Sequence, residues 1–341
     1  MNSPNVRSAG IVLAALLTCF AGAGEAGAAI LDTGEVEAAQ ARGAIVWDVR
    51  PEEDYRKGHI PGAVNMDDIL GRLRDPKSED YLPVPRLAAL LGELGVDPRR
   101  EVVLYGAKAN TAAYFGMVTL QWLGGDAVHV YHGGIDDWKA GGRPVATEAS
   151  RLPPLSLSLQ PRDERLVDTA AVVARLGRAD VQIVDVRSAR EFSGDDIRAL
   201  RGGHIPGAVN VPYESQWIDP DTPRKLARKQ VTGKDGFNLK PLEELRSLYA
   251  GLDPDKETIV YCQSGVRASN TAAVLQSLGF AKVRVYDASW LGYGNTLDAP
   301  AENVSFFNVA RVSNLLQALQ QRVEDLETQM GDLKNGLRKQ P

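Results

Sequence analysis

Short apolar runs alternate with amphipathic stretches along most of the chain. The runs are rich in Val, Ile, Leu and aromatic residues, which is typical of strands buried on both faces, and the stretches between them show helical spacing. The predicted strands are 44–50, 101–105, 127–131, 181–187, 258–261 and 283–286. The predicted helices are 32–42, 85–94, 112–123, 242–252 and 268–278. Strands that alternate with helices predict an α/β fold with parallel sheets.

The same order of elements occurs twice. The octet Gly-His-Ile-Pro-Gly-Ala-Val-Asn at 58–65 returns unchanged at 203–210, and the Asp-Val-Arg at 48–50 returns at 185–187. A repeat of roughly 140 residues is far longer than a solenoid unit, so each copy is expected to form a domain. The proline-containing segment 150–165 is expected to link the two copies.

The N-terminus has the composition of a cleaved export signal. Arg7 precedes the apolar run 11–20, and the small residues at 26–28 form a cleavage site. We therefore expect a mature protein that is periplasmic or secreted, with lipidation of Cys19 as the alternative. After cleavage Cys262 is the only cysteine left, so it has no partner for an intramolecular disulfide.

The C-terminal part of the chain has a separate pattern. Apolar residues alternate at spacings of three and four over about four heptads, which is the a/d seam of a coiled coil. The seam consists of Val309, Val312, Leu316, Leu319, Val323, Leu326, Met330, Leu333 and Leu337. Arg322 and Glu327 fall at g and the following e position, where they can pair across a parallel dimer. We expect this tail to self-associate, and a helix lying on its own domain is the alternative.

Cys262 is the residue expected to react as a nucleophile. Cys262 follows the predicted strand 258–261 and precedes the predicted helix 268–278, so it lies on a loop at a helix N-terminus. Backbone N–H groups, the helix dipole and Arg267 together favour the thiolate, which is the reactive form of cysteine. Gly265 lets the backbone turn where a Cβ would clash. The net charge of −5 gives no indication of nucleic-acid binding.

The loop from Cys262 to Arg267 reads Cys-Gln-Ser-Gly-Val-Arg. It is one residue shorter than the Cys-x5-Arg loop of cysteine phosphatases, and a shorter ring of amides suits a smaller anionic group, such as the terminal sulfur of a persulfide. Together with the repeated Asp-Val-Arg, the octets and Tyr-Asp-Ala-Ser-Trp at 286–290, it resembles the tandem-domain rhodanese (thiosulfate/3-mercaptopyruvate sulfurtransferase) family over residues 35–300.

The resemblance implies two rhodanese-like domains, each a parallel sheet flanked by helices, and the heptad pattern adds a C-terminal coiled-coil helix. The resemblance assigns catalysis to Cys262. It assigns binding of the substrate and the persulfide to the rest of the loop, Gln263, Ser264, Gly265, Val266 and Arg267. The expected division of the chain is a signal peptide at 1–28, a first domain at 29–150, a linker at 151–165, a second, catalytic domain at 166–302 and the coiled-coil helix at 303–341.

The two copies differ where the chemistry is expected. Gly106 takes the place of the cysteine in the first copy, so we expect that domain to be inactive and to help form the substrate cleft. Asp185, Arg187 and Arg190 are supporting candidates in the second copy. Members of the family that use thiosulfate or mercaptopyruvate usually carry a substrate-binding arginine six positions after the Asp of the Asp-Val-Arg motif, whereas this chain has Glu191.

The second copy also has an additional basic segment at 216–240. Its basic residues include Arg224, Lys225, Arg228, Lys229 and Lys234. We expect a solvated loop, which can also attract anionic donors if it lies near the cleft. The histidine of the octet occurs in both copies, as His59 and His204. Because the first copy has no cysteine in its loop, this indicates a structural role for the histidine.

The resemblance implies a sulfurtransferase that moves sulfane sulfur from an anionic donor, thiosulfate first, to a thiol or sulfur-carrier acceptor through a Cys262 persulfide. No metal and no organic cofactor are implied. The alternatives are a 3-mercaptopyruvate sulfurtransferase and a periplasmic persulfide carrier or scaffold without turnover. A phosphatase or arsenate reductase is disfavoured by the short loop.

Overall fold

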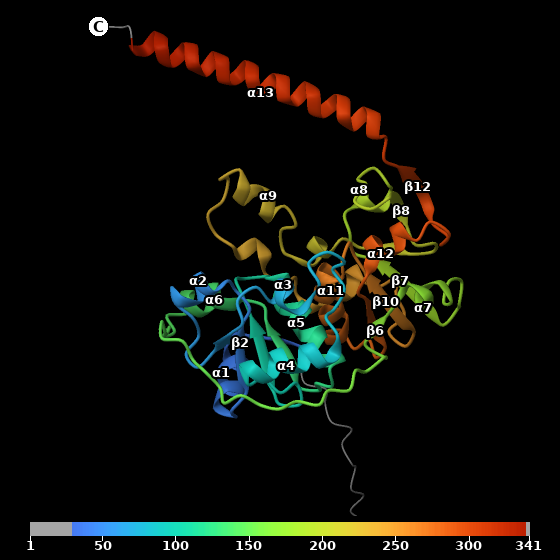
Figure 1. Ribbon diagram of the computed structural model, residues 1–341. Coiled ribbons are helices and arrows are strands. Elements are labelled where there is room, and N and C mark those ends of the chain that lie inside the picture. Colours follow the sequence, from blue (N-terminus) through green and yellow to red (C-terminus); the bar gives the residue numbers. More distant parts are fainter. Residues whose placement is uncertain (1–28, 339–341) are drawn as a thin grey trace, which may run out of the picture.

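The computed structural model describes residues 29–338, without the side chains at 309–312, 315 and 332–338. The predicted signal peptide and Cys19 therefore lie outside the described residues. Figure 1 shows two α/β domains next to each other, with a long helix, α13 (Val309–Arg338), leading away from them. Within the described range, no helix is long and apolar enough to cross a membrane.

The first domain is built on a parallel sheet with strand order β1-β5-β4-β2-β3. Its strands are β1 (Ile30–Leu31), β2 (Ile45–Asp48), β3 (Val64–Asn65), β4 (Val102–Tyr105) and β5 (Val128–Tyr131). Its helices are α1 (Thr33–Ala41), α2 (Glu52–Arg56), α3 (Ile69–Leu73), α4 (Val84–Leu94), α5 (Thr111–Trp122) and α6 (Gly134–Ala140).

The second domain repeats this arrangement with the order β6-β11-β10-β7-β9, again all parallel. These strands are β6 (Leu166–Val167), β7 (Val181–Asp185), β9 (Val209–Asn210), β10 (Glu257–Tyr261) and β11 (Val283–Tyr286). Its helices are α7 (Thr169–Val173), α8 (Ala189–Phe192), α9 (Thr222–Ala227), α10 (Leu242–Leu248), α11 (Val266–Ser277) and α12 (Ser289–Asn295), with 3-10 turns η1 (Tyr213–Gln216) and η2 (Asp235–Phe237). The predicted fold class is therefore confirmed.

Each sheet has helices on both faces, and one face of each sheet is turned toward the other domain. On the inner faces, residues of α3, α4, α5, α10 and α11 belong to one continuous core. Residues of α1 and α6, and those of α7 and α12, form separate cores on the outer faces. The domains therefore share their largest core, and the sequence pattern, which treats the copies as separate units, did not predict this.

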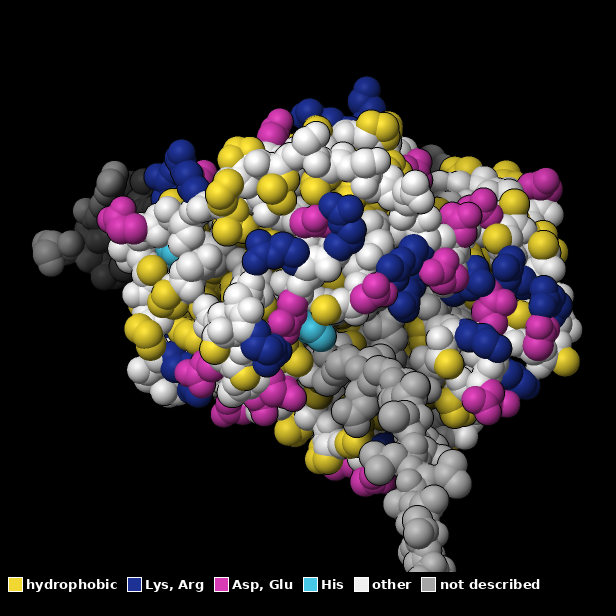
Figure 2. All heavy atoms as spheres, turned by 90° about the horizontal axis from the view of Figure 1, so that it is seen from below, with side chains coloured by type: hydrophobic (Ala, Val, Ile, Leu, Met, Phe, Trp, Pro, Cys, Tyr) yellow, Lys and Arg dark blue, Asp and Glu magenta, His cyan; other side chains and the backbone are white. Residues whose placement is uncertain are grey.

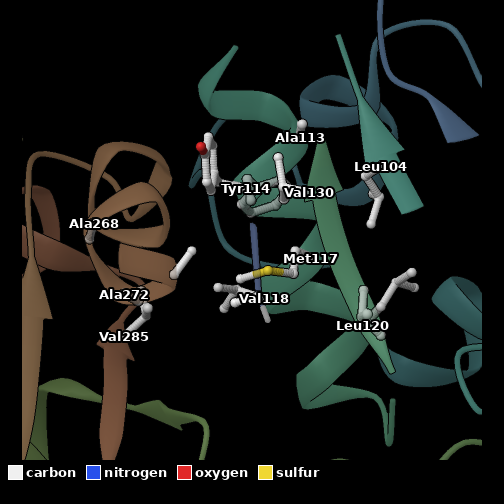
Figure 3. Packing of buried hydrophobic residues seen from close by; sticks show 14 of the residues in the cluster. Leu104, Ala113, Tyr114, Met117, Val118, Leu120, Val130, Ala268, Ala272 and Val285 are labelled. Atoms are coloured by element: carbon white, nitrogen blue, oxygen red, sulfur yellow. The ribbon is translucent and has the colours of Figure 1, made fainter. Parts of the chain in front are cut away.

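The shared core centres on α5 and α11. Figure 3 shows Ala272 of α11 next to α5, from which Tyr114 and Val118 project toward α11. The small side chain of Ala272 lets the two helices approach closely, because it fills little volume between the backbones. At the end of the contact, Gln121 and Gln276, which occupy the same position in α5 and α11, exchange hydrogen bonds of 3.3 and 3.2 Å. The duplication thus places equivalent helices against each other.

The start of the tail differs from the predicted boundary at 303. Residues Glu302–Phe306 form strand β12, which pairs antiparallel with β8 (Arg201–His204), so they belong to the second domain. The long helix begins only at Val309. Neither strand has a clear alternating pattern, and β8 contains Gly-Gly, which is why the sequence did not indicate this ladder.

One face of the molecule carries both charges in a mixed distribution. Figure 2 shows basic and acidic side chains interspersed over this face, without a large patch of either sign. This agrees with the modest net charge of −5.

Candidate active site

Cys262 follows the central strand of the second sheet. β10 lies between β7 and β11, and the thiol comes directly after its last residue, Tyr261, at the carboxyl edge where open α/β sheets bind ligands. The cysteine has no disulfide partner among the described residues and is only 1% exposed. α11 begins at Val266, so the loop enters the N-terminus of a 12-residue helix, as predicted.

Ser289 holds the loop from inside the same domain. Its Oγ accepts hydrogen bonds from the backbone N–H of Cys262 at 3.1 Å and of Gly265 at 3.0 Å, and it donates to Tyr286 O at 2.6 Å. Ser289 is fully buried and has a φ of 49°, a left-handed conformation that is uncommon for a residue with a Cβ. The sequence analysis treated Ser289 only as part of a motif and missed this anchoring role.

Three other amides of the loop are unused. In the described part of the chain, the backbone N–H groups of Gln263, Ser264 and Arg267 have no carbonyl or side-chain acceptor. Val266 N–H donates to Ser264 O at 3.0 Å, which tightens the turn. The free amides, at the N-terminus of α11, are donors that a bound anion can use.

Arg267 forms an ion pair with Glu191. Its Nη1 donates to Oε2 at 2.9 Å and its Nη2 to Oε1 at 2.8 Å, while Arg198, whose side chain is 51% exposed, lies 3.2 Å from Oε1. Burial alone would raise the pKa of Glu191, but hydrogen bonds and charge from Arg267, together with hydrogen bonds from Ser188, lower that pKa to about 2. Arg190, the candidate chosen from the sequence, is exposed and makes none of these contacts.

Glu191 therefore has a definite place in the site. It stands where a substrate-binding arginine was expected, and it pairs with the loop arginine while Ser188 and Glu191 form the capping box of α8. Arg198 and Arg267 both pair with the carboxylate of Glu191, so these three side chains together have one positive charge in excess. Arg198 is half exposed, so this charge is accessible to solvent.

The other two supporting candidates form a buried ion pair of their own. Arg187 Nη2 lies 2.5 Å from Asp185 Oδ2 and also donates to Gly203 O at 2.7 Å, and the arginine is only 1% exposed. Asp48 and Arg50 repeat the pair at 2.5 Å in the first domain. Since the copy without a cysteine has the same contacts, this pair braces the end of the strand in both domains.

The histidines of the two octets have equivalent structural contacts. His59 stacks on Tyr55 with ring centroids 3.7 Å apart, and His204 stacks on Phe192 at 3.6 Å. In each case Nδ1 is hydrogen-bonded to the carbonyl oxygen of the stacked residue. Among the described side chains, no group of three or more His, Cys, Asp or Glu is arranged to hold a metal ion.

The first domain has lost two parts of the site. Gly106 replaces Cys262, and Gly134 replaces the anchoring Ser289. Gly134 has a φ of 55°, and a Cβ there would lie 2.3 Å from Gly106 O. Lys108, in the equivalent loop, is buried and paired with a carboxylate at 2.8 Å. Comparing the two repeats position by position reveals the second glycine from sequence alone.

We expect that restoring the thiol in the first domain does not restore activity. Gly106→Cys combined with Cys262→Ser should turn over no faster than Cys262→Ser alone, because the Ser289 equivalent is missing and a Cβ at 106 would lie 2.7 Å from Asn110 Nδ2. Thiocyanate production measures this, with Gly106→Cys alone as the control that should keep wild-type activity. Restored turnover in the double variant would contradict the expectation.

The segment 216–240 contacts the first domain beside the loop that corresponds to Cys262–Arg267. Lys234 Nζ lies 2.8 Å from Asp136, and Phe237 O is 2.8 Å from Nε2 of His132. Burial lowers the pKa of His132 to about 4, so the neutral ring donates to that carbonyl. Trp217 is 3% exposed. The expectation of a solvated loop is therefore wrong near both ends of the segment. Trp217 is buried near one end, and Lys234 and Phe237 contact the first domain near the other.

Comparison with known proteins agrees with this fold. The described residues form a tandem α/β protein with one cysteine on a loop at a helix N-terminus, and the family model described as "Rhodanese-like domain" matches residues 32–141 and 168–296. The chain therefore belongs to the rhodanese family, and it is a rhodanese-type sulfurtransferase, with a sulfur donor and an acceptor as partners.

Two curated relatives and one solved structure illustrate the similarity. A thiosulfate sulfurtransferase of Azotobacter vinelandii is 35% identical over 262 residues, which cover 76% of this chain and 90% of the relative. A sulfur carrier protein of Thermus thermophilus is 33% identical over 261 residues, which cover 72% and 86%. The structure of a 3-mercaptopyruvate sulfotransferase of Escherichia coli matches with a TM-score of 0.63 and 26% identity, covering 77% of this chain and 99% of that one.

Proposed function

We propose that this protein transfers sulfane sulfur from thiosulfate to a thiophilic acceptor through a persulfide on Cys262. The observation that carries the proposal is the loop itself: a lone thiol lies on it together with the free amides of Gln263, Ser264 and Arg267. Amide donors and a helix N-terminus stabilise a negatively charged sulfur without needing a metal or a proton donor.

The reaction consists of two displacements. The Cys262 thiolate attacks the outer sulfur of thiosulfate, a sulfur–sulfur bond forms, and the bond within thiosulfate breaks so that sulfite leaves with the electron pair. The acceptor then attacks the terminal sulfur of the persulfide and releases the Cys262 thiolate. With cyanide as acceptor the product is thiocyanate. Charge and atoms balance in both steps, and the covalent intermediate makes the kinetics ping-pong.

Two features favour a small anionic donor. The cluster of Arg267, Glu191 and Arg198 has one positive charge in excess, and Arg198 is half exposed, so it can attract an anion to the loop. The thiol is 1% exposed, which favours attack on a slim terminal sulfur over attack on a bulky group. The Azotobacter vinelandii relative named thiosulfate sulfurtransferase supports thiosulfate as the donor.

A persulfide carrier with little turnover is the second candidate function. It is favoured by the pairing of Arg267 with Glu191, which neutralises one of the groups that would bind a donor, and by the Thermus thermophilus relative named a sulfur carrier protein. 3-Mercaptopyruvate is the alternative donor, supported by the Escherichia coli structure.

Mass spectrometry and turnover separate these functions. The protein is incubated with thiosulfate or 3-mercaptopyruvate, and the mass at Cys262 is followed together with thiocyanate release on adding cyanide. An added mass of about 32 Da with rapid turnover supports the enzyme, and the same mass with no turnover supports the carrier. If the protein shows no mass change and no turnover with either donor, the persulfide mechanism is rejected.

We further propose that α13 forms a parallel two-stranded coiled coil with α13 of a second copy. Its described seam residues are between 44% and 56% exposed, and Figure 1 shows the helix projecting from the body. Val323 at an a position between Leu319 and Leu326 at d positions favours two strands. Arg322 and Glu327, at g and the following e position, are complementary only across a parallel pair in register.

Leu319→Glu with Leu326→Glu is expected to convert a dimer into a monomer, because charges at d positions cannot be buried in the seam. Light scattering after size-exclusion chromatography measures the mass, and turnover per chain should not change. Gln321→Glu with Thr328→Glu, on the outer face of the same helix, is the matched control and should stay dimeric. A monomeric wild-type protein, or a dimeric Leu319 and Leu326 variant, would overturn the coiled-coil proposal.

A further inference from the structure

The first domain contacts the catalytic loop through one buried arginine. Arg74 lies at the end of α3 and is 6% exposed. Its Nη1 donates to the carbonyl oxygen of Ser264 at 2.7 Å, and its Nη2 forms an ion pair with Asp287 of the second domain. Because Ser264 is in the loop between Cys262 and Arg267, a residue of the inactive domain is directly bonded to the active one.

The guanidinium of Arg74 is held in place by aromatic rings of its own domain. Its Cζ lies 4.4 Å from the centroid of Phe115 and 5.3 Å from that of Tyr81, distances at which a cation is attracted to a ring. The Tyr81 hydroxyl is in turn hydrogen-bonded to Thr119 Oγ1 at 2.9 Å, and both Phe115 and Thr119 belong to α5. The arginine is therefore oriented by the helix that packs against α11.

Arg74 and Ser289 together fix the two ends of one peptide group. The Ser264–Gly265 peptide presents its carbonyl oxygen to Arg74 and its N–H to Ser289 Oγ at 3.0 Å. Gly265 has a φ of 77°, and a Cβ there would lie 2.7 Å from Asp287 Oδ1 and 3.1 Å from Arg74 Nη2. This peptide plane cannot turn without breaking both hydrogen bonds, one from each domain.

We propose that Arg74 is a positioning residue through which the first domain orients the free amides of the catalytic loop. Those of Gln263 and Ser264 lie directly before the clamped peptide, so their direction depends on it. This role extends the proposed function, since the orientation matters for an anionic sulfur at Cys262. It also gives the domain without a cysteine a part in the reaction itself, in addition to packing against the second domain.

The first test is Arg74→Met, which keeps an unbranched apolar stem and removes the guanidinium together with its hydrogen bond to Ser264. Burial raises the pKa of Asp287 to about 6 in spite of Arg74, so the carboxyl of the variant can take up a proton and need not stay as an unpaired buried charge. We expect kcat/KM for thiosulfate and the rate of Cys262 alkylation by iodoacetamide at pH 7 each to fall about tenfold. Alkylation requires no persulfide, so it tests the positioning role even if the protein forms none with any donor.

Two further variants distinguish the effect of the hydrogen bond to Ser264 from the effects of local charge and of overall stability. Arg74→Met with Asp287→Asn removes the ion pair without changing the combined charge, and it should stay as slow as Arg74→Met if the hydrogen bond to Ser264 is what matters. Asp287→Asn alone keeps that hydrogen bond and should stay near the wild-type rates. Wild-type alkylation and turnover in the double variant, or in Arg74→Met at temperatures where it is fully folded, would overturn the proposal.

Discussion

Replacing Cys262 with serine is expected to abolish thiocyanate production from thiosulfate and cyanide, with a loss of at least about a thousandfold. A serine hydroxyl can accept the same hydrogen bonds but cannot form a persulfide, and Cys262 is the only cysteine in the described chain. Steady-state turnover measures the loss, and mass spectrometry after incubation with thiosulfate should show no added sulfur. The free energy of unfolding should change little, because oxygen for sulfur is a small change in volume.

Ser269→Ala is a matched control for this variant. Ser269 is buried in the first turns of α11 and donates to Gly265 O at 3.0 Å, so its loss tests general damage to the loop without removing the nucleophile. It should keep a mass adduct on Cys262 and most of its turnover. Turnover by Cys262→Ser above a small fraction of the wild-type rate would show that another group receives the sulfur.

The sequence predicted the parts of the site that are local in the chain. Strand, cysteine, glycine and helix follow one another from β10 to α11, so their spacing was enough to place Cys262 at a helix N-terminus. The repeated octets and Asp-Val-Arg motifs likewise predicted two copies of one fold, and comparison of the copies located the missing cysteine at Gly106.

The remaining parts of the site depend on tertiary contacts, which produce no periodic pattern in the sequence. Arg74 is 190 residues from Ser264 along the chain and follows a short helix in the other domain. Glu191 was recognised as a departure from the family, but its pairing with Arg267 required the position of α8 relative to the loop. Strands of two residues, such as β1 and β6, are too short for any pattern of alternation to indicate them.

The shared core packs the domain without a cysteine closely against the domain that carries Cys262. α5 packs on α11, the same helix whose N-terminus carries the catalytic loop, and Phe115 of α5 lies under Arg74, which bonds to Ser264. The first domain thus supports the loop both from below, through packing, and at its tip, through a hydrogen bond. None of these contacts involves Gly106, the position that corresponds to Cys262.

Arg267→Gln is expected to have the second largest effect, on both activity and stability. The variant loses the charge next to the thiolate and the persulfide, so kcat/KM for thiosulfate should fall by about a hundredfold. It also leaves Glu191 buried with only the half-exposed Arg198, which should lower the free energy of unfolding by about 3 kcal/mol at pH 7. Urea unfolding and steady-state kinetics measure the two effects.

Combining Arg267→Gln with Glu191→Gln distinguishes the two effects. The double variant has no unpaired buried charge, and an amide at 191 can still accept the hydrogen bond from Ser188 N–H, so most of the stability should return. The activity should not return, because the positive charge at the loop is still missing. A double variant that regains both would show that Arg267 acts only through the fold.

The dependence on pH gives an independent check of the same ion pair. The pKa of Glu191 is lowered to about 2 from an ordinary value of 4.5, so the folded protein holds this proton less tightly than the unfolded chain does. The stability that the pair supplies is therefore fully present above about pH 4.5 and is lost as the pH falls toward 2. The difference in unfolding free energy between the wild-type protein and Arg267→Gln should follow the same curve, large at pH 7 and small near pH 2.5. A difference that stays constant over this range would mean that Glu191 is not ionised next to Arg267 in the folded protein, and the charge balance on which the choice of an anionic donor depends would then be wrong.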